Sequence, residues 1–373
     1  MITMKYLYIA LIACLVVASD AAACTSAIVS GRVTANGRPL LWKHRDTGAG
    51  DNKVERIAAT DSTFEYVALF NAADRDCREA WIGYNSAGFA VMNTAVYNLK
   101  DDTVTNMDRE GLVMTEALKR CRSVGDFARL LDSLPRPLGV EANFGVIDAA
   151  GDGAYFETCN YGYVKYDLAD APDGVLVRTN YAHSGRNGEG KGYTREDNAW
   201  HLLEAHIANH CVSAELFTEV LSKQFYCSRT GVDDTYSEKQ VLADQDYIPR
   251  YTSTATVVVE GVVEGESPLL TTMWIGLGYP PCAELRTVWL GDGGLPDELR
   301  GVGYNGHSPL CDTVMARKAR VFSPVDGGKH RVDIGKLYNS RGTGYCQQLI
   351  PRNKEAYRRG YELLEARRKK LAR

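Results

Sequence analysis

A cysteine directly behind a secretory signal is the feature that most limits what this chain can fold into. Lys5 is followed by an apolar run and then by Ala21-Ala22-Ala23. A positive charge, a short apolar segment and small residues before a cleavage site are typical of a signal peptide. The apolar run is too short for an ordinary membrane-spanning helix. We therefore predict a signal peptide over residues 1–23 and a mature chain, residues 24–373, that begins with Cys24.

A cysteine at the start of a chain carries a nucleophile and a base in one residue. Its α-amine has a pKa of about 8, so part of it is uncharged at neutral pH. The uncharged amine can accept the thiol proton, which activates the sulfur without a separate histidine. It can later return that proton to a leaving amine. Cys24 is therefore a candidate nucleophile that works only after the residues before it are removed.

A lipid anchor is the main alternative for Cys24. Bacterial lipoproteins also begin with a cysteine after small residues, and lipid on the sulfur and amine would end catalysis there. They usually have a large aliphatic residue three positions before the cysteine, where this chain has Ala21, and often a flexible polar tether behind it. Here the segment TSAIVSGRV (25–33) is typical of a strand. The residues favour the free nucleophile over the lipid anchor and over an ordinary buried or paired cysteine.

Strand-like runs separated by turns alternate with helical regions along the mature chain. Asn36-Gly37 between two apolar runs predicts a hairpin at the start. Apolar residues at helical spacing predict helices over 109–134, with a break near 123–125, and over 195–224. Further strands are expected at 65–71, 80–93, 142–157, 174–180, 253–263, 270–278 and 285–291. This order predicts a single α+β domain over 24–373, with largely antiparallel sheets, helices packed outside and a C-terminal helix.

The charge pattern does not indicate a nucleic-acid partner. The chain has 43 basic and 47 acidic residues, a net charge of −4, whereas nucleic-acid-binding domains usually carry a strong basic patch. Basic residues do gather in RRGYELLEARRKKLAR at 358–373. We interpret this segment as the solvated face of an amphipathic helix, with a surface for anionic partners as the alternative.

The cysteines suggest disulfides rather than a metal site. Besides Cys14 in the signal and Cys24, the chain contains Cys77, Cys121, Cys159, Cys211, Cys227, Cys282, Cys311 and Cys346. An even number in an exported protein predicts one or more disulfides, although the pairing is not readable from sequence. No CxxC pair occurs, and His206 and His210 lack a third ligand. We therefore predict no metal site, and the sequence implies no organic cofactor.

Three segments resemble one enzyme superfamily. They are CTSAIVSGRVTANGRPLLWKHRDT (24–47), GYNSAGFAVMNTAVYNL (83–99) and VLVRTNYAHSG (175–185). In this order they are similar to the N-terminal-nucleophile (Ntn) hydrolases whose first residue is cysteine. This group includes penicillin V acylase, conjugated bile acid hydrolase and the acyl-coenzyme A:6-aminopenicillanate acyltransferases. The resemblance spans residues 24–187 and implies a four-layer αββα sandwich with the nucleophile at the start of a central strand.

The resemblance also implies a reaction. It suggests an amidohydrolase that cleaves a linear amide of a small N-acyl or peptide-like substrate through a thioester on Cys24. Acyl transfer to another amine is a further possibility. A dipeptidase of the same superfamily and a non-catalytic surface lipoprotein lipidated at Cys24 remain alternatives. With the signal peptide, we expect an exported protein, periplasmic or secreted, that meets the membrane only if Cys24 carries lipid.

Four positions match the family's main site residues. The resemblance makes Cys24 the nucleophile and Asp46 the carboxylate that orients its amine, since a negative charge stabilises the protonated amine. Asn93 and Asn180 match asparagines that help hold the tetrahedral intermediate, where amide N–H groups suit a developing oxyanion.

Two further positions match the family less closely. Lys43 stands where the family often has arginine, and Arg45 lies nearby, so that either could supply the positive charge. Lysine and arginine are not interchangeable, because only arginine has the planar fork of donors. Arg250 aligns loosely with an arginine near the cysteine of bile salt hydrolases.

Three other features receive plainer interpretations. Asn85 is expected to serve a turn, and Glu157 is expected to be structural. The glycine-rich segment 185–193 lacks the spacing of a phosphate loop and is interpreted as a loop beside the site.

Overall fold

The computed structural model describes residues 23–237, 241–243, 246–291, 294–324 and 330–371. Apart from Ala23, the predicted signal peptide lies outside the described residues. Within these ranges, no helix combines the length and apolar character needed to cross a membrane.

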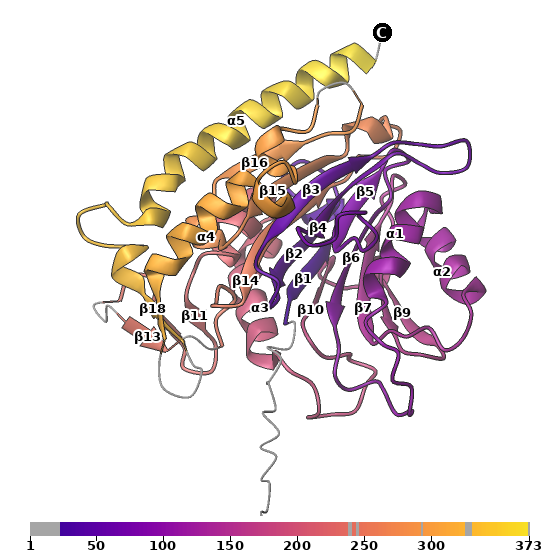
Figure 1. Cartoon of the computed structure of the whole chain (residues 1–373), viewed down its shortest axis with the longest axis horizontal. Helices are drawn as coiled ribbons and strands as arrows, with labels where there is room; N and C mark the ends of the chain where they lie inside the picture. Colours follow the sequence, from indigo (N-terminus) through magenta and orange to yellow (C-terminus); the bar gives the residue numbers. More distant parts are fainter. Residues whose placement is uncertain (1–22, 238–240, 244–245, 292–293, 325–329, 372–373) are drawn as a thin grey trace, which may run out of the picture.

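Two antiparallel sheets stacked face to face form the centre of the structure (Figure 1). The first has six strands, in the spatial order β10 (Val175–Arg178), β1 (Thr25–Val29), β2 (Leu40–Asp46), β14 (Ser253–Glu260), β15 (Thr272–Leu277) and β16 (Leu285–Val288). The second has seven, in the order β3 (Asn52–Ile57), β4 (Tyr66–Asn71), β5 (Ile82–Asn85), β6 (Ala90–Ala95), β7 (Ala142–Ile147), β8 (Gly153–Thr158) and β9 (Tyr163–Asp167).

Alternation along the strands explains how the two sheets share a core. In β1, Ile28 points to the apolar cluster between the sheets, whereas Ala27 and Val29 point to the cluster on the outer face. Successive side chains of a strand face opposite sides of a sheet, so a strand buried on both faces is apolar throughout. All five residues of β1 are buried, which explains why the segment behind Cys24 shows a continuous apolar run.

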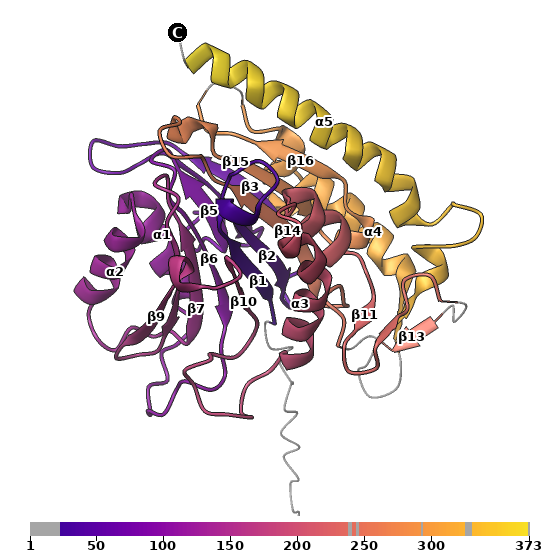
Figure 2. The same ribbon diagram turned by 180° about the vertical axis from the view of Figure 1, so that it is seen from behind.

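Helices cover both outer faces of the stacked sheets. α1 (Glu110–Arg120) and α2 (Val124–Ser133) pack on the seven-stranded sheet, and α3 (Tyr193–Ala208) and α5 (Tyr345–Leu371) pack on the six-stranded sheet (Figures 1 and 2). Phe127 of α2 illustrates the contact, because its ring packs against aromatic rings of β7 and β8. The structure thus confirms the four-layer αββα arrangement with antiparallel sheets.

The remaining elements lie around the lower half of α5. α4 (Pro309–Val321) runs beside two small sheets. These consist of β11 (Tyr226–Cys227) with β12 (Val232–Asp233), and of β13 (Val241–Ala243), β18 (His330–Asp333) and β17 (Phe322–Pro324). The sequence analysis did not predict α4, β3 or β9.

Local hydrogen bonds explain where the two predicted helical regions divide. Ser123 Oγ accepts from the backbone N–H of Asp126, and the Asp126 carboxylate accepts from the backbone N–H of Ser123. This capping box starts α2 and confirms the predicted break. In the second region, Val212 exchanges backbone hydrogen bonds with Val33 and Ala35. This pairing divides the helical region predicted over 195–224 into α3 and the π-helix η3 (Leu216–Leu221).

The predicted disulfides are not formed. The nine cysteines in the described part of the chain are all free thiols. Six of them lie inside three separate apolar clusters, where a thiol behaves as a small apolar side chain. They are Cys77, Cys121, Cys227, Cys282, Cys311 and Cys346.

A thiol titration tests this correction. We expect the denatured, unreduced chain of residues 24–373 to react with nine equivalents of a thiol reagent, because the fold leaves every cysteine reduced. The same chain after reduction serves as the control. Each disulfide in the folded protein would lower the count by two, and a count of seven or fewer would contradict the structure.

Candidate active site

Cys24 lies directly before β1, at the edge of the sheet where β1 begins and β2 ends. It is only 4% exposed. Its side chain lines a cavity of about 560 Å³ that Lys43, Arg45 and Asn93 also line. The β1–β2 register pairs Thr25 with His44, so the position of Cys24 follows from the hairpin itself.

Asp46, the last residue of β2, forms hydrogen bonds beside Cys24 through both its backbone oxygen and its carboxylate. Its backbone oxygen accepts from the backbone N–H of Ala23 at 3.2 Å and from the Cys24 thiol at 3.8 Å. Its carboxylate accepts from Arg250 Nε at 2.9 Å and from Ser253 Oγ at 2.6 Å. The carboxylate is fully buried, and the charge of Arg250 compensates for that burial.

Ser253 connects Asp46 to His44. The Ser253 hydroxyl has one proton, which it donates to Asp46, so Oγ is an acceptor for His44 Nε2 at 2.7 Å. His44 is thereby the Nε2–H tautomer. Burial lowers the pKa of His44 to about 4, although Asp46 acts in the opposite direction. His44 is thus a neutral buried group that holds Asp46 through Ser253, and the sequence analysis assigned it no role.

Lys43 and Arg45 both face the cavity, because alternate residues of a strand share a face. Lys43 Nζ donates to Asn93 Oδ1 at 2.7 Å and to the Trp81 carbonyl at 3.0 Å. Arg45 donates to the side-chain oxygens of Asn52 and Asn71. Burial lowers the pKa of Lys43 to about 8 and that of Arg45 to about 10. Two cations therefore lie near Cys24. Which of them fills the role of the family's arginine stays open.

The two asparagines differ in their surroundings. Asn93 lines the cavity. Because Lys43 Nζ can only donate, the Asn93 oxygen faces Lys43 and its amide N–H groups are turned away from it. Asn180 is fully buried, donates to the Ala95 carbonyl at 2.7 Å and accepts from Arg195 Nη2 at 2.7 Å. The geometry suits Asn93 to a donor role and Asn180 to positioning Arg195. The oxyanion role of both stays a prediction.

Arg195 is a site residue that sequence reasoning missed. Its Nη1 donates to the Cys24 carbonyl at 2.7 Å and to Thr25 Oγ1 at 2.8 Å. Burial, together with nearby Arg250, lowers its pKa to about 9. One signal could have found it: a basic residue in the first turn of a helix opposes the helix dipole, and Arg195 lies in the first turn of α3.

A second cavity of about 470 Å³ lies on the Ala23 side of the cysteine. Lys191, Arg195 and Arg250 line it together with Ala23. Arg250 Nη2 donates to the Ala23 carbonyl at 2.9 Å, which brings the loosely aligned arginine to the start of the mature chain. Residues of the glycine-rich segment 185–193 form part of this wall, so the segment lies beside the site, as predicted.

Two plainer interpretations are confirmed. Asn85 Oδ1 accepts from the backbone N–H groups of Ala87 and Phe89, which is a turn role. Glu157 forms a buried ion pair with Arg178 at 2.7 Å, away from the residues that line the two cavities.

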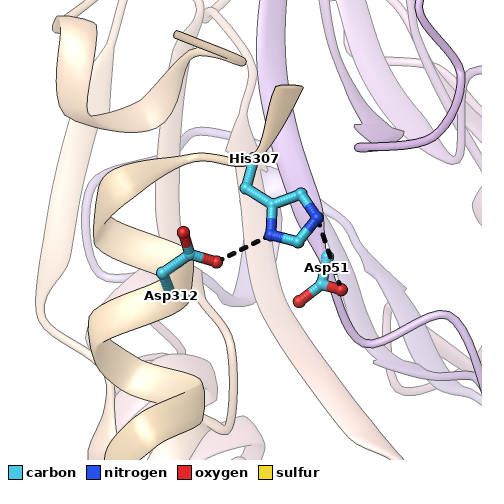
Figure 3. Close-up of side chains that lie close together, drawn as sticks. All are labelled: Asp51, His307 and Asp312. Atoms are coloured by element: carbon cyan, nitrogen blue, oxygen red, sulfur yellow. Dashed lines mark hydrogen bonds and ion pairs between the residues drawn. The ribbon is translucent and has the colours of Figure 1, made fainter. Parts of the chain in front are cut away.

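One cluster of potential metal ligands occurs among the described residues. Asp51, His307 and Asp312 lie close together (Figure 3). Asp312 faces His307 Nδ1 at 2.9 Å, and Asp51 faces Nε2 at 3.7 Å. One ligand atom from each residue lies within 4.8 Å of the other two, but the two carboxylates face different nitrogens of the ring. We interpret them as ion pairs that connect the segment behind β2 to the start of α4.

Comparisons with known proteins find similarity only at the level of structure. No protein-family model matches the sequence, and no curated protein is similar to it. One solved structure is a Caenorhabditis elegans N-acylethanolamine-hydrolyzing acid amidase ortholog, at 14% identity and a TM-score of 0.44, over 66% of this chain and 93% of that one.

Two bacterial structures are also similar. A variant of conjugated bile acid hydrolase from Clostridium perfringens has 12% identity and a TM-score of 0.44, over 73% of this chain and 94% of that one. Penicillin V acylase from Agrobacterium tumefaciens has 11% identity and a TM-score of 0.36, over 72% and 86%. Both enzymes belong to the group that the sequence resembles. At these TM-scores, any case for an activity has to come from Cys24 and its neighbours.

The low pKa of Lys43 predicts a pH dependence of stability. Its pKa is about 8 in the folded chain against an ordinary 10.5, so between these values the unfolded chain binds more protons and stability rises with pH. Lys43→Met removes this rise. We expect the stability advantage of the parent over the variant to increase by about 2 kcal/mol between pH 7 and pH 9.5.

Urea unfolding at the two pH values measures this difference. Lys119→Met is the matched control, because Lys119 is a surface residue of α1 paired with Glu116. A difference between the parent and Lys43→Met that stays constant from pH 7 to pH 9.5 would contradict the assigned pKa.

Proposed function

We propose that this chain is an exported amide hydrolase of the Ntn type, with Cys24 as its N-terminal nucleophile. One observation carries the proposal. A cysteine that the sequence predicts to be the first residue after signal cleavage lies at the start of an interior strand, with its thiol in a cavity lined by Lys43 and Asn93. An ordinary core cysteine needs neither the cleavage site nor the cavity.

The proposed reaction begins with proton transfer inside Cys24. The free α-amine takes the thiol proton, and the sulfur attacks the carbonyl carbon of the substrate amide. When the tetrahedral intermediate collapses, the α-amine returns the proton to the leaving nitrogen, and the acyl group stays on sulfur as a thioester. Water then attacks the thioester and releases the acid. An amine in place of water would give acyl transfer, and we favour hydrolysis because water is abundant outside the cell.

The surrounding residues suit this sequence of steps. Asp46, held by Arg250 and Ser253, provides a buried negative charge beside the start of the mature chain, which stabilises the amine in its protonated state. The Asn93 amide faces the cavity with its N–H groups directed away from Lys43, so it can donate to the oxyanion. Lys43 supplies a second, cationic donor below the pKa of about 8 that burial gives it.

The burial of Cys24 argues against the lipid anchor. A lipidated cysteine has to reach the bilayer, so a polypeptide tether usually separates it from the folded body. Here Cys24 is 4% exposed and Thr25 already belongs to β1. Arg195 also holds the Cys24 carbonyl. Lipid on this sulfur would have to occupy the cavity beside Lys43 and Asn93.

Substitution of Cys24 tests the proposal directly. With a protein that starts at residue 24 and a panel of N-acyl amino acids, bile-acid conjugates, penicillin V and dipeptides, we expect turnover of at least one acyl amide. Cys24→Ala should lower that turnover by at least about 10³-fold, because it removes the nucleophile and leaves binding groups intact. Amine release measures the rate, and formation of a new amide in the presence of added amine measures transfer.

Cys211→Ser is the matched control, because Cys211 is an exposed thiol that lines neither of the two cavities. Its turnover should equal that of the parent. Turnover by Cys24→Ala at the rate of the parent would contradict the proposal, and cleavage confined to dipeptides would favour the dipeptidase alternative.

A further inference from the structure

The wall of the cavity beside Cys24 contains several carboxylates. Glu79, Asp108, Glu110 and Glu141 all contribute to its wall. They come from the segment before β5, from the start of α1 and from the residue before β7. Four carboxylates from three separate segments thus converge on one cavity of about 560 Å³.

These carboxylates have no ion-pair partner in the described part of the chain. None of its ion pairs involves any of the four. The cations of the same cavity form their ion pairs and hydrogen bonds with other groups. Lys100 pairs with Asp102 at 3.3 Å, Lys43 donates to Asn93 and to the Trp81 carbonyl, and Arg45 donates to two asparagines. Glu110 favours the charged form of Lys43, so Lys43 offsets part of the negative charge without forming an ion pair with any of the four carboxylates.

One of the four residues, Glu110, is buried, and burial makes its charge costly for the chain alone. Glu110 is 7% exposed, and its Oε1 accepts from the backbone N–H of Glu141 at 3.0 Å. Burial raises the pKa of Glu110 to about 7, and burial together with Asp74 raises the pKa of Glu79. A buried carboxylate is stabilised when a cation lies beside it. The remaining wall includes Trp81 and Met107, which suit an aliphatic chain.

The position of the sulfur indicates which part of a substrate enters this cavity. Cys24 lines the acidic cavity, whereas Ala23, which is bonded to the Cys24 nitrogen, lines the second cavity. The acyl group becomes bonded to sulfur, and the leaving amine must lie near the α-amine that protonates it. The acyl part therefore belongs in the acidic cavity.

We propose that the acyl part of the substrate carries a protonated amine, which Glu110 and the three other carboxylates of the cavity wall bind. The substrate class is then an ω-aminoacyl amide. This inference rests on the proposed function, because it needs the acyl group to be bonded to Cys24. Glu110 is accordingly a specificity-determining residue that selects the cation.

Matched pairs of anilides test the preference. The 4-nitroanilides of 4-aminobutanoic and 6-aminohexanoic acid are compared with those of pentanoic and heptanoic acid, in which a methyl group replaces the ammonium. We expect kcat/KM of the ammonium compound to exceed that of its partner by at least about 10-fold in one pair or both, since a buried charge pair is strong. Glu110→Gln should lower this ratio at least 10-fold, mainly through KM, because glutamine keeps the acceptor for Glu141.

Glu116→Gln is the control, since Glu116 is on the same helix but pairs with Lys119 and Arg120 at the surface. It should leave the ratio unchanged. If Glu110→Gln does not fold, Glu79→Gln provides a second test of the same ratio. If no anilide is cleaved, protection of Cys24 from iodoacetamide by the same compounds gives the preference.

Two results would overturn the inference. One is equal or better use of the methyl compounds in both pairs by the parent protein. The other is a ratio that Glu110→Gln and Glu79→Gln leave unchanged. Failure of the proposed function looks different, because Cys24→Ala would then cleave the anilides as well as the parent does.

Discussion

The pairing of β1 with β2 is the constraint on which the rest of the site depends. It places the end of β2 beside the start of β1, so that the Asp46 backbone oxygen contacts both the Ala23 N–H and the Cys24 thiol. A shift of this pairing by one residue would turn every β1 side chain to the opposite face. Ile28 and its neighbours are buried on both faces, so the apolar core itself opposes such a shift.

The charged groups differ between the two sides of Cys24. On the Ala23 side, Arg195 donates to the Cys24 carbonyl, whereas Arg250 donates to the Ala23 carbonyl and pairs with Asp46. On the sulfur side, Lys43 and Arg45 line a cavity together with Glu110 and three further carboxylates, and Lys43 interacts electrostatically with both Cys24 and Glu110. An amide that spans Cys24 would thus meet cationic groups at its leaving end and anionic groups at its acyl end, which joins the proposed chemistry to a preference for one substrate class.

Local patterns in the sequence predicted the parts of the fold that depend on interactions between residues close together in the chain. Ser123 with Asp126 marks the start of α2, and the strand behind Cys24 follows from its continuous apolar run. The site residues that the sequence analysis missed acquire their roles only through tertiary contacts. Ser253 gains its role only because β14 pairs with β2, opposite Asp46, and Glu110 meets the cavity only through the packing of α1. The disulfide prediction failed because it used the parity of the cysteines, whereas the fold distributes most of them among separate apolar clusters.

The central claim is that Cys24 becomes a free N-terminal residue. Intact-mass and N-terminal peptide mass spectrometry on protein exported by its own leader tests it most directly. The account predicts a chain that begins at Cys24 with an unmodified amine and thiol, and a single added mass on that residue after treatment with a thiol-reactive acyl analogue. A lipid mass on Cys24, or a chain that starts elsewhere and keeps the Cys24 nitrogen in a peptide bond, would contradict it.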